Sequence, residues 1–197
     1  MSQSAYRRQL EDWLAKLEVK ANSVLDVGGG SNPVKGRVKS WEVGHYEIFD
    51  SNLEESNEKI DFVFDINDRI LKTGPYNDAD LFDVVFCLEV FDYVYNPVTA
   101  MKNLYDLTKT NGTLIITFPF VYPNHNPVQH DFLRYTKQGA IELLGRAGFT
   151  INKVTPRLIN HTGHWLNLME ADGYRYKGAA MAQTLFDSGY IIEATKK

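Results

Sequence analysis

Acidic side chains follow a series of short apolar runs in the first half of the chain. Asp26 lies in the run SVLDV, Asp50 follows HYEIF, Asp65 follows DFVF, and Glu89 comes two residues after FDVVFC. A carboxylate accepts several hydrogen bonds, so each acid could bind a hydroxyl or an amine of one ligand. In an open parallel sheet, ligands bind beyond the carboxyl ends of the strands, where these acids would lie. The pattern therefore predicts a site for one ligand that carries hydroxyl and amine groups.

A glycine turn follows Asp26 and narrows the ligand class. Residues 28–30 are all glycine, which lets the backbone adopt positive φ and approach a ligand closely. The dinucleotide fingerprint G-x-G-x-x-G would need a glycine at position 33, where this chain has Pro33, and no Gly-Lys-Ser/Thr of a phosphate-binding loop follows. A nucleoside ligand without a diphosphate is favoured, and a plain tight turn after a strand is the alternative.

Two later segments, residues 120–135 and 156–188, are rich in His, Asn, Tyr and Gly and fit no alternation of strands and helices. We expect them to form loops or an irregular cap over the edge of the sheet. Histidine and carboxylate side chains are the usual proton acceptors in catalysis. The candidate catalytic residues are His125, His130 and Asp131, and the candidate substrate-binding residues are Arg134, Tyr135, His161 and His164.

Each of these candidates has a structural alternative. Arg134 could clamp a carboxylate or phosphate of the acceptor, or it could simply pair with Asp131. The histidines could shape loops. His161 and His164 have the spacing of one helical face but no firm third ligand, so no metal site is predicted. Cys87 falls within an apolar strand pattern and is expected in the core.

The apolar periodicity predicts the elements that position these residues. Strands are expected over residues 23–27, 45–49, 61–64, 82–87, 113–118, 149–154 and 190–194. Helices are expected over residues 4–18 within an N-terminal helical segment 1–20, from Asn96-Pro97 to Asn111-Gly112, and from Thr136 to Gly148. Such alternation predicts an α/β fold with a mostly parallel sheet covered on both faces.

Composition excludes several classes of protein. The 197 residues suit one domain, expected to span residues 1–197, and the net charge of −4 disfavours a broad surface for duplex nucleic acid. The single cysteine excludes an intramolecular disulfide. The sequence has no apolar run of about 18 residues, so no membrane span is expected. The charged N-terminal segment is unlike a signal peptide, which favours a cytoplasmic protein. No pattern indicates the oligomeric state.

The order and spacing of the motifs resemble those of the class I S-adenosylmethionine-dependent methyltransferases over roughly residues 20–155. The segments that carry the resemblance are VLDVGGGSNP (24–33), YEIFD (46–50), DFVFDIND (61–68), FDVVFCLEVFDYVYNP (82–97) and NGTLIITFPF (111–120). One departure is Asn32, which replaces the third glycine of the family's loop. The segments PFVYPNH, HDFLRYT and AGF are similar to a subgroup associated with glycan or cell-surface biosynthesis. The resemblance implies a Rossmann-like, doubly wound sheet of seven strands with an antiparallel strand near the C-terminus.

The resemblance also implies roles for individual residues around S-adenosylmethionine. Asp26 and the backbone of Gly28, Gly29 and Gly30 would lie under the methionine moiety. Asp50 would accept hydrogen bonds from both ribose hydroxyls.

The same resemblance places the other end of the cofactor. Asp65 would accept a hydrogen bond from the adenine amine, with the Ile66 backbone beside the ring. Leu88 and Glu89 would border the methionine moiety and the acceptor.

Methyl transfer from a sulfonium is an in-line displacement, so the protein must mainly align the acceptor and exclude water. The sequence predicts transfer to a small-molecule or glycan acceptor, and a nucleic-acid acceptor is disfavoured because no Asn/Asp-Pro-Pro-Tyr/Phe tetrapeptide is present. Two alternatives stay open: a nucleoside-binding module without catalysis, and an NAD-dependent oxidoreductase.

Overall fold

A computed structural model describes residues 4–51, 60–69, 81–122, 124, 127–158 and 187–197. The strands are β1 (Glu18–Val27), β2 (Ser40–Asp50), β3 (Phe62–Val63), β4 (Phe82–Cys87), β5 (Thr108–Pro119), β6 (Phe149–Leu158) and β7 (Asp187–Lys196). The helices are α1 (Ala5–Leu14), α2 (Pro97–Leu107) and α3 (Lys137–Ala147), with a 3-10 turn η2 (Val128–His130).

The seven strands form one sheet in the order β3-β2-β1-β4-β5-β7-β6. The pairs from β3 to β5 are parallel, and β7 is antiparallel to both β5 and β6. The predicted Rossmann-like sheet, mostly parallel and with an antiparallel strand near the C-terminus, is confirmed.

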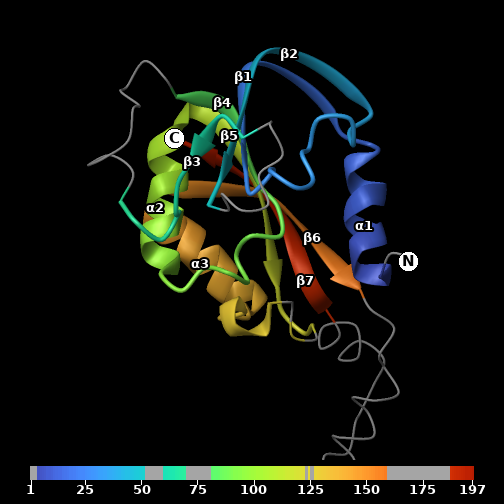
Figure 1. Cartoon of the computed structure of the whole chain (residues 1–197), viewed down its shortest axis with the longest axis vertical. Coiled ribbons are helices and arrows are strands. Elements are labelled where there is room, and N and C mark those ends of the chain that lie inside the picture. The colour runs from blue at the N-terminus through green and yellow to red at the C-terminus, as the bar shows by residue number, and fades with distance from the viewer. Residues whose placement is uncertain (1–3, 52–59, 70–80, 123, 125–126, 159–186) are drawn as a thin grey trace, which may run out of the picture.

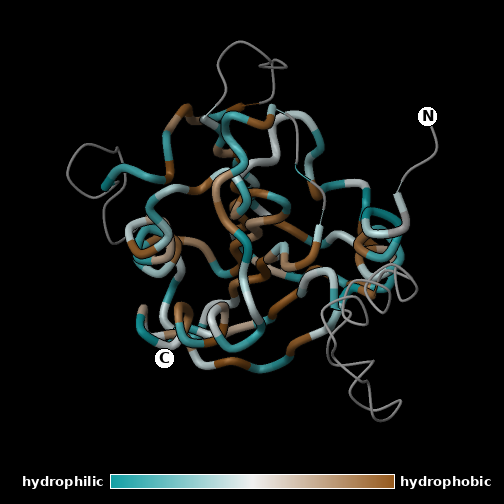
Figure 2. Tube along the Cα trace, turned by 90° about the horizontal axis from the view of Figure 1, so that it is seen from below, coloured by the Kyte–Doolittle hydropathy of each residue, from teal (hydrophilic) through white to brown (hydrophobic). Residues whose placement is uncertain are grey.

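Helices cover both faces of this sheet, with α1 on one side and α2 and α3 on the other (Figure 1). Successive residues of a strand point to opposite faces. Val24 accordingly packs in the cluster that contains Leu10 and Leu14 of α1, whereas its neighbour Leu25 packs with Leu104 of α2. Figure 2 shows the apolar parts of the trace gathered between the helices. Burial of each such leucine contributes about 2 kcal/mol to stability.

Local signals begin α2 and begin and end α3 as expected, but α2 ends at Leu107 rather than at Asn111-Gly112, because β5 already begins at Thr108. The Thr136 hydroxyl accepts a hydrogen bond from the backbone N–H of Gly139 at 3.1 Å, and Gly148 ends α3 with φ at 111°. Asn96 caps α2, and Pro97 occupies its first turn.

Several predicted boundaries differ from the observed ones. The N-terminal helix, expected over residues 4–18 in a helical segment 1–20, ends at Leu14, because the chain from Glu18 pairs with β2. That pairing also starts β2 at Ser40 rather than at residue 45.

The segment 156–188, expected as loops or a cap, contributes strand residues at both of its ends. β6 continues to Leu158 and β7 begins at Asp187, because the two strands pair along this stretch. Residues 159–186 lie outside the described residues. In the described part of the segment 120–135, the regular structure is the short turn η2. Over the described chain, no helix is long and apolar enough to cross a membrane.

Candidate functional site

The strand order reverses between β1 and β4, and this reversal locates the site. From β1 the chain continues to β2 on one side, and from β4 it continues to β5 on the other. Ligands of open α/β sheets bind at the carboxyl ends of the strands beside such a point. The parallel strands β1, β2 and β4 end there at Val27, Asp50 and Cys87. The topology therefore brings the glycine turn, Asp50 and the residues after β4 to one edge.

The glycine turn is joined directly to the end of β2. Gly28 has φ at +80°, and its N–H donates to the carbonyl oxygen of Phe49 at 2.7 Å. The N–H of Gly30 donates to Oδ2 of Asp50 at 2.9 Å. A Cβ at Gly28 would lie 2.3 Å from Cγ2 of Val90, and a Cβ at Gly30 would lie 2.6 Å from Oδ2 of Asp50. Neither position has room for a side chain, so the turn presents bare backbone at the site.

Asp26, near the end of β1, holds the glycine loop in place. Its side chain is buried, and Oδ2 accepts hydrogen bonds from the Val34 N–H at 2.6 Å and the Tyr46 hydroxyl at 2.8 Å. Burial raises the pKa of Asp26 to about 6, although these two hydrogen bonds lower it. A Cβ at Gly29 would lie 2.5 Å from the Asp26 carboxyl carbon. These contacts shape the loop, and a direct contact between Asp26 and a ligand stays a prediction.

Asp65 and Ile66 form a turn after β3. Oδ1 of Asp65 accepts hydrogen bonds from the backbone and side-chain nitrogens of Asn67, at 2.9 and 2.8 Å, while Ile66 is buried. Oδ1 of Asn67 in turn accepts from the backbone N–H groups of Tyr95 and Asn96, at 3.0 and 2.9 Å. Asn67 thus ties this turn to the loop after β4. Its place in the Asp-Ile-Asn sequence, typical of an Asx turn, could have revealed it.

Glu89 has a left-handed backbone, with φ at 58°, and a buried arginine partner. Nη1 of Arg157 lies 2.5 Å from Oε1 of Glu89, and Nη2 lies 3.1 Å from Oε2. The Thr117 hydroxyl accepts from the Glu89 N–H at 2.7 Å and donates to Oε1 at 2.9 Å. Burial raises the pKa of Glu89, but the Arg157 charge and the hydrogen bonds outweigh it and hold this pKa below its usual value. Sequence analysis missed Arg157, because the predicted strand stopped at residue 154.

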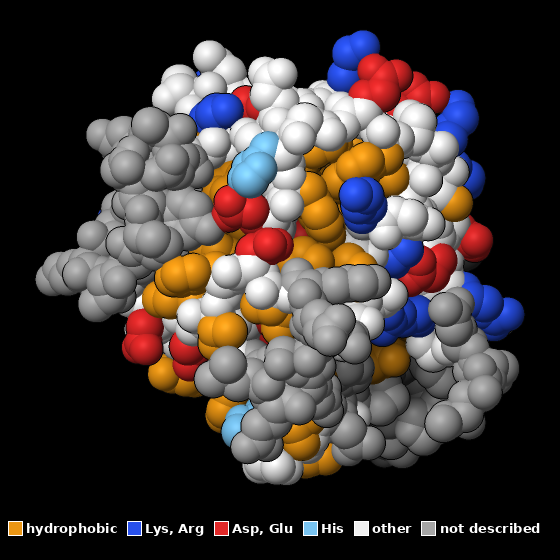
Figure 3. Space-filling view, turned by 45° about the horizontal axis from the view of Figure 1, so that its top comes forward, with side chains coloured by type: hydrophobic (Ala, Val, Ile, Leu, Met, Phe, Trp, Pro, Cys, Tyr) orange, Lys and Arg blue, Asp and Glu red, His pale blue; other side chains and the backbone are white. Residues whose placement is uncertain are grey.

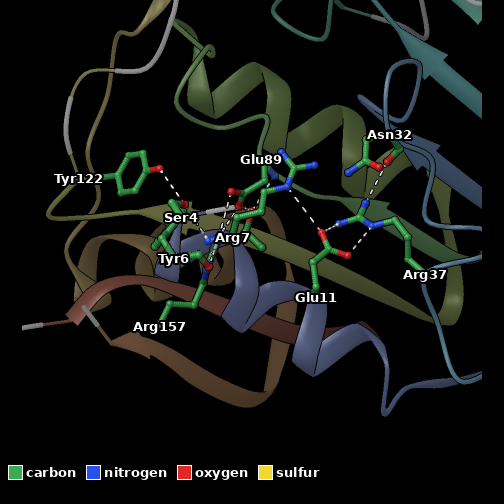
Figure 4. Close-up of polar contacts among 10 residues, drawn as sticks. Ser4, Tyr6, Arg7, Glu11, Asn32, Arg37, Glu89, Tyr122 and Arg157 are labelled. Atoms are coloured by element: carbon green, nitrogen blue, oxygen red, sulfur yellow. Dashed lines mark hydrogen bonds and ion pairs between the residues drawn. The ribbon is translucent and has the colours of Figure 1, made fainter. Parts of the chain in front are cut away.

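Helix α1 is attached to the site at two places, which Figure 4 shows together. At one, Nη2 of Arg157 donates to the carbonyl oxygen of Tyr6 at 2.9 Å. At the other, Arg37 makes two hydrogen bonds to the Glu11 carboxylate, at 3.0 and 2.7 Å, and a third to the carbonyl oxygen of Asn32 at 2.9 Å. Asn32 is the residue that departs from the glycine pattern, and the structure uses its backbone to link the loop to α1.

In the segment 120–135, Asp131 and Arg134 form the ion pair that the sequence offered as the structural alternative to substrate binding. Nη1 of Arg134 lies 2.5 Å from Oδ1 of Asp131, and Nη2 lies 2.6 Å from Oδ2. His130 is exposed, and its ring centre lies 6.3 Å from that of Phe132. His125, His161 and His164 lie outside the described residues.

Tyr135 is buried among aromatic rings. Its ring centre lies 4.9 Å from that of Phe118 and 5.9 Å from that of Phe91. The Tyr135 hydroxyl is buried and has no hydrogen-bond partner among the described residues. Burial, followed by the negative charge of Asp92, raises the pKa of this hydroxyl. The structure thus gives Tyr135 a place in the core.

A second carboxylate, Asp92, lies beside Glu89. A small cavity between α1 and the ends of β4 and β5 is lined by Tyr6, Glu89, Asp92, Pro119 and Tyr122. Asp92 is 6% exposed, and burial, together with the charge of Glu89, raises its pKa to about 7. Sequence analysis missed Asp92, although its spacing of three residues from Glu89 was visible.

At the opposite end of the sheet, where the parallel strands begin, the described residues form no second set of acids around a glycine turn. An open hollow there is lined by Lys20, Asn22 and Asp83, among others. The Asp83 carboxylate on β4 connects neighbouring strands. It accepts hydrogen bonds from the backbone N–H groups of Asn22 and Ser23 on β1, and it pairs with Lys109 on β5 at 2.9 Å. On the right-hand side of the face drawn in Figure 3, lysine and arginine side chains alternate with acidic ones.

Comparisons with known proteins agree with the observed fold. The methyltransferase domain family matches residues 2–153 of the chain. No curated protein sequence matches it.

Several solved structures share the fold at low sequence identity. A chain of the Haloferax volcanii complex that contains the Trm112 methyltransferase activator is 15% identical, with a TM-score of 0.64 over 97% of this chain and 88% of that one. The N-methyltransferase NodS of Bradyrhizobium japonicum WM9, in complex with S-adenosyl-L-homocysteine, is 12% identical, with a TM-score of 0.61 over 97% and 87%. The [4+2]-cyclase SpnF is 16% identical, with a TM-score of 0.57 over 95% and 80%. Since the family match spans most of the chain, this protein belongs to the methyltransferase domain family.

Proposed function

We propose that the protein is an S-adenosylmethionine-dependent methyltransferase that acts on a small-molecule or glycan-type acceptor. The observation that carries the proposal is the hydrogen bond between Asp50 and the Gly30 backbone, which joins an acid to a bare glycine turn at the switch point of the sheet. The family membership and the S-adenosyl-L-homocysteine complex of NodS support the same cofactor.

The residues at the edge fit a nucleoside with an amino-acid tail. A Cβ at Gly28 would collide with Val90 and one at Gly30 with Asp50, so only glycine lets the turn pack this closely against the strand ends that border the proposed site. Asp50 ends β2 beside this turn, and a carboxylate with two acceptor oxygens suits the two ribose hydroxyls of such a ligand. Asp26, Gly28, Gly29, Gly30, Asp50, Asp65, Ile66, Leu88 and Glu89 are the proposed cofactor-binding residues.

When bound, the cofactor supplies an electrophilic methyl group and a good leaving group. The chain's own residues would orient the acceptor, exclude water and hold the proton that an oxygen or nitrogen acceptor releases. Asp92 fits the role of proton holder, because it lines the cavity beside Glu89 and its pKa of about 7 favours proton exchange near neutral pH. Asp131 fits it less well, since both of its oxygens bind Arg134.

The cofactor claim is tested by isothermal titration with S-adenosylmethionine and S-adenosylhomocysteine. We expect both to bind the wild type, and Asp50→Asn to weaken binding by at least about tenfold, the effect of about 1.4 kcal/mol. Asp12→Asn on the exposed side of α1 is the matched control and should bind like the wild type. A wild type that binds neither compound at about millimolar concentration would refute the proposal.

The transferase claim needs a separate test. Cofactor with a labelled methyl group is incubated with pools of small molecules and glycans, and label is followed into products. We expect label in at least one pool, and a loss of that label in Asp92→Asn.

A second candidate function is a nucleoside-binding module without catalysis. Its support is that Asp131 is paired with Arg134 and that His130 is exposed, so the contacts of these two predicted proton acceptors indicate no catalytic role. Cofactor binding without label transfer to any pool would favour this function. An NAD-dependent oxidoreductase is opposed by Pro33 in the loop and by the family match, and NADH fluorescence titration tests it directly.

A further inference from the structure

We propose that Arg157 is a positioning residue that couples the docking of helix α1 to the Glu89 carboxylate at the cofactor edge. This proposal rests on the proposed function, because it assigns Glu89 to the amino group of the cofactor's methionine moiety. Neither the family match nor the motif spacing points to Arg157, which lies near the end of β6.

The guanidinium of Arg157 contacts two elements that are distant in sequence. It holds both oxygens of Glu89 after β4, and Nη2 also donates to the carbonyl oxygen of Tyr6 in the first turn of α1. Arg157 is fully buried. A planar guanidinium can hold a carboxylate with two bonds and bind a third group at once, which the single ammonium of lysine matches poorly.

The ring of Tyr6 extends this connection to the acceptor side. The guanidinium carbon of Arg157 lies 3.2 Å from the centre of the Tyr6 ring, and the Tyr6 ring centre lies 4.4 Å from that of Tyr122 in the segment after β5. Tyr6, Glu89 and Tyr122 all line the small cavity. Displacing α1 would therefore move Tyr6 out of the lining of that cavity. Figure 4 shows Tyr6, Arg157 and Glu89 side by side.

The position of Glu89 matters for the cofactor because its neighbours form the other wall of the glycine turn. Val90 lies so close to Gly28 that a Cβ there would meet its Cγ2 at 2.3 Å, and Leu88 is buried in the core cluster that includes Leu10 and Leu14 of α1. Glu89 stands between these two residues with φ at 58°, a conformation that costs energy for a residue other than glycine. The bonds from Arg157 and Thr117 hold it there.

The charged and titratable groups that face Glu89 determine how its protonation should change when Arg157 is replaced. They are Arg157 on β6, Arg7 and Tyr6 on α1, and Asp92 on its own loop. In Arg157→Met the burial of Glu89 remains while its main counter-charge is gone, so the pKa of its carboxyl should rise above that in the wild type. Only the ionised carboxylate accepts a hydrogen bond from an ammonium group with full strength.

The experiment measures S-adenosylhomocysteine affinity from about pH 5 to about pH 8, together with amide hydrogen exchange of α1. We expect Arg157→Met to bind at least roughly tenfold more weakly than the wild type, with an affinity that rises with pH, and to exchange faster in α1. Arg157→Met combined with Glu89→Gln should lose that additional pH dependence, while any contribution of Asp92 remains in both proteins. Arg146→Met, which removes an exposed ion pair of α3, is the matched control.

The outcomes separate this proposal from the proposed function. If the wild type binds S-adenosylhomocysteine and Arg157→Met has the same affinity, pH profile and hydrogen exchange, the role of Arg157 alone is overturned. A wild type that does not bind S-adenosylhomocysteine would overturn the proposed function and the role of Glu89 with it. If Arg157→Met does not fold, Arg157→Lys carries the test. We expect the same pH profile as the wild type but faster exchange in α1, and unchanged exchange would refute the coupling.

Discussion

The buried carboxylate of Asp26 should make the stability of the protein fall as the pH rises. Asp26→Asn replaces this group, which is 2% exposed, with a neutral amide of nearly the same shape. The amide oxygen can still accept the hydrogen bonds from Val34 and Tyr46. The substitution therefore removes the charge while it keeps the contacts that hold the glycine loop.

The magnitude follows from the pKa of Asp26 in the two states. Burial raises this pKa from 3.8 to about 6, so the folded protein binds the proton more tightly than the unfolded chain does. The resulting stabilisation is fully present below the unfolded pKa and is lost as the pH rises through the folded one. At about 1.4 kcal/mol per pH unit, the loss amounts to about 3 kcal/mol.

Urea unfolding from about pH 4 to about pH 8 measures this loss. The free energy of unfolding of the wild type, minus that of Asp26→Asn, should fall by about 2.5 kcal/mol across the range, because a small part of the loss has already occurred at about pH 4. Asp92 titrates in both proteins, so its contribution to the pH dependence cancels when the two free energies of unfolding are subtracted. Asp12→Asn on exposed α1 should follow the wild type. A difference that stays constant with pH would show that burial does not control the charge of Asp26.

Three further predictions concern the frame of the site, and urea unfolding measures each. Gly28→Ala should lower the free energy of unfolding by about 1–3 kcal/mol, because φ at +80° disfavours a side chain and the new Cβ overlaps Val90. Adding Val90→Ala should relieve only the overlap, and full recovery would contradict the backbone argument. Asn67→Ala should cost about 1–3 kcal/mol, since two backbone N–H groups after β4 lose their acceptor; a neutral effect would mean that water replaces it. Thr136→Ala should cost about 1 kcal/mol through the lost cap of α3, and Thr136→Ser should restore most of it.

Features set by neighbouring residues could be predicted from the sequence. Thr136 and Gly148 mark the ends of α3, and Asn96-Pro97 begins α2, because capping depends on backbone groups within a few positions. The acids at the strand ends and the glycine turn could also be recognised, since strand periodicity and chain direction place them at one edge. The structure confirms the predicted sheet of seven strands.

Strand lengths were harder to predict because pairing extends strands beyond their apolar runs. Glu18 and Lys20 are exposed residues that resemble a helix end in sequence, yet they pair with Ser40 and Glu42 in β2. The backbone hydrogen bonds of a neighbouring strand, rather than the side chains, decide where such a strand begins.

The sequence alone therefore determined the order of the elements, the bare glycine turn and the acids that border it, because each depends on local spacing and on which residues carry a side chain. Only the tertiary structure decided which groups these acids contact. Arg157 reaches Glu89 across 68 positions and Tyr46 reaches Asp26 across 20. Such partners are set by strand order and by the docking of α1, and a buried charge is stable only where the fold brings a counter-charge or donors to it.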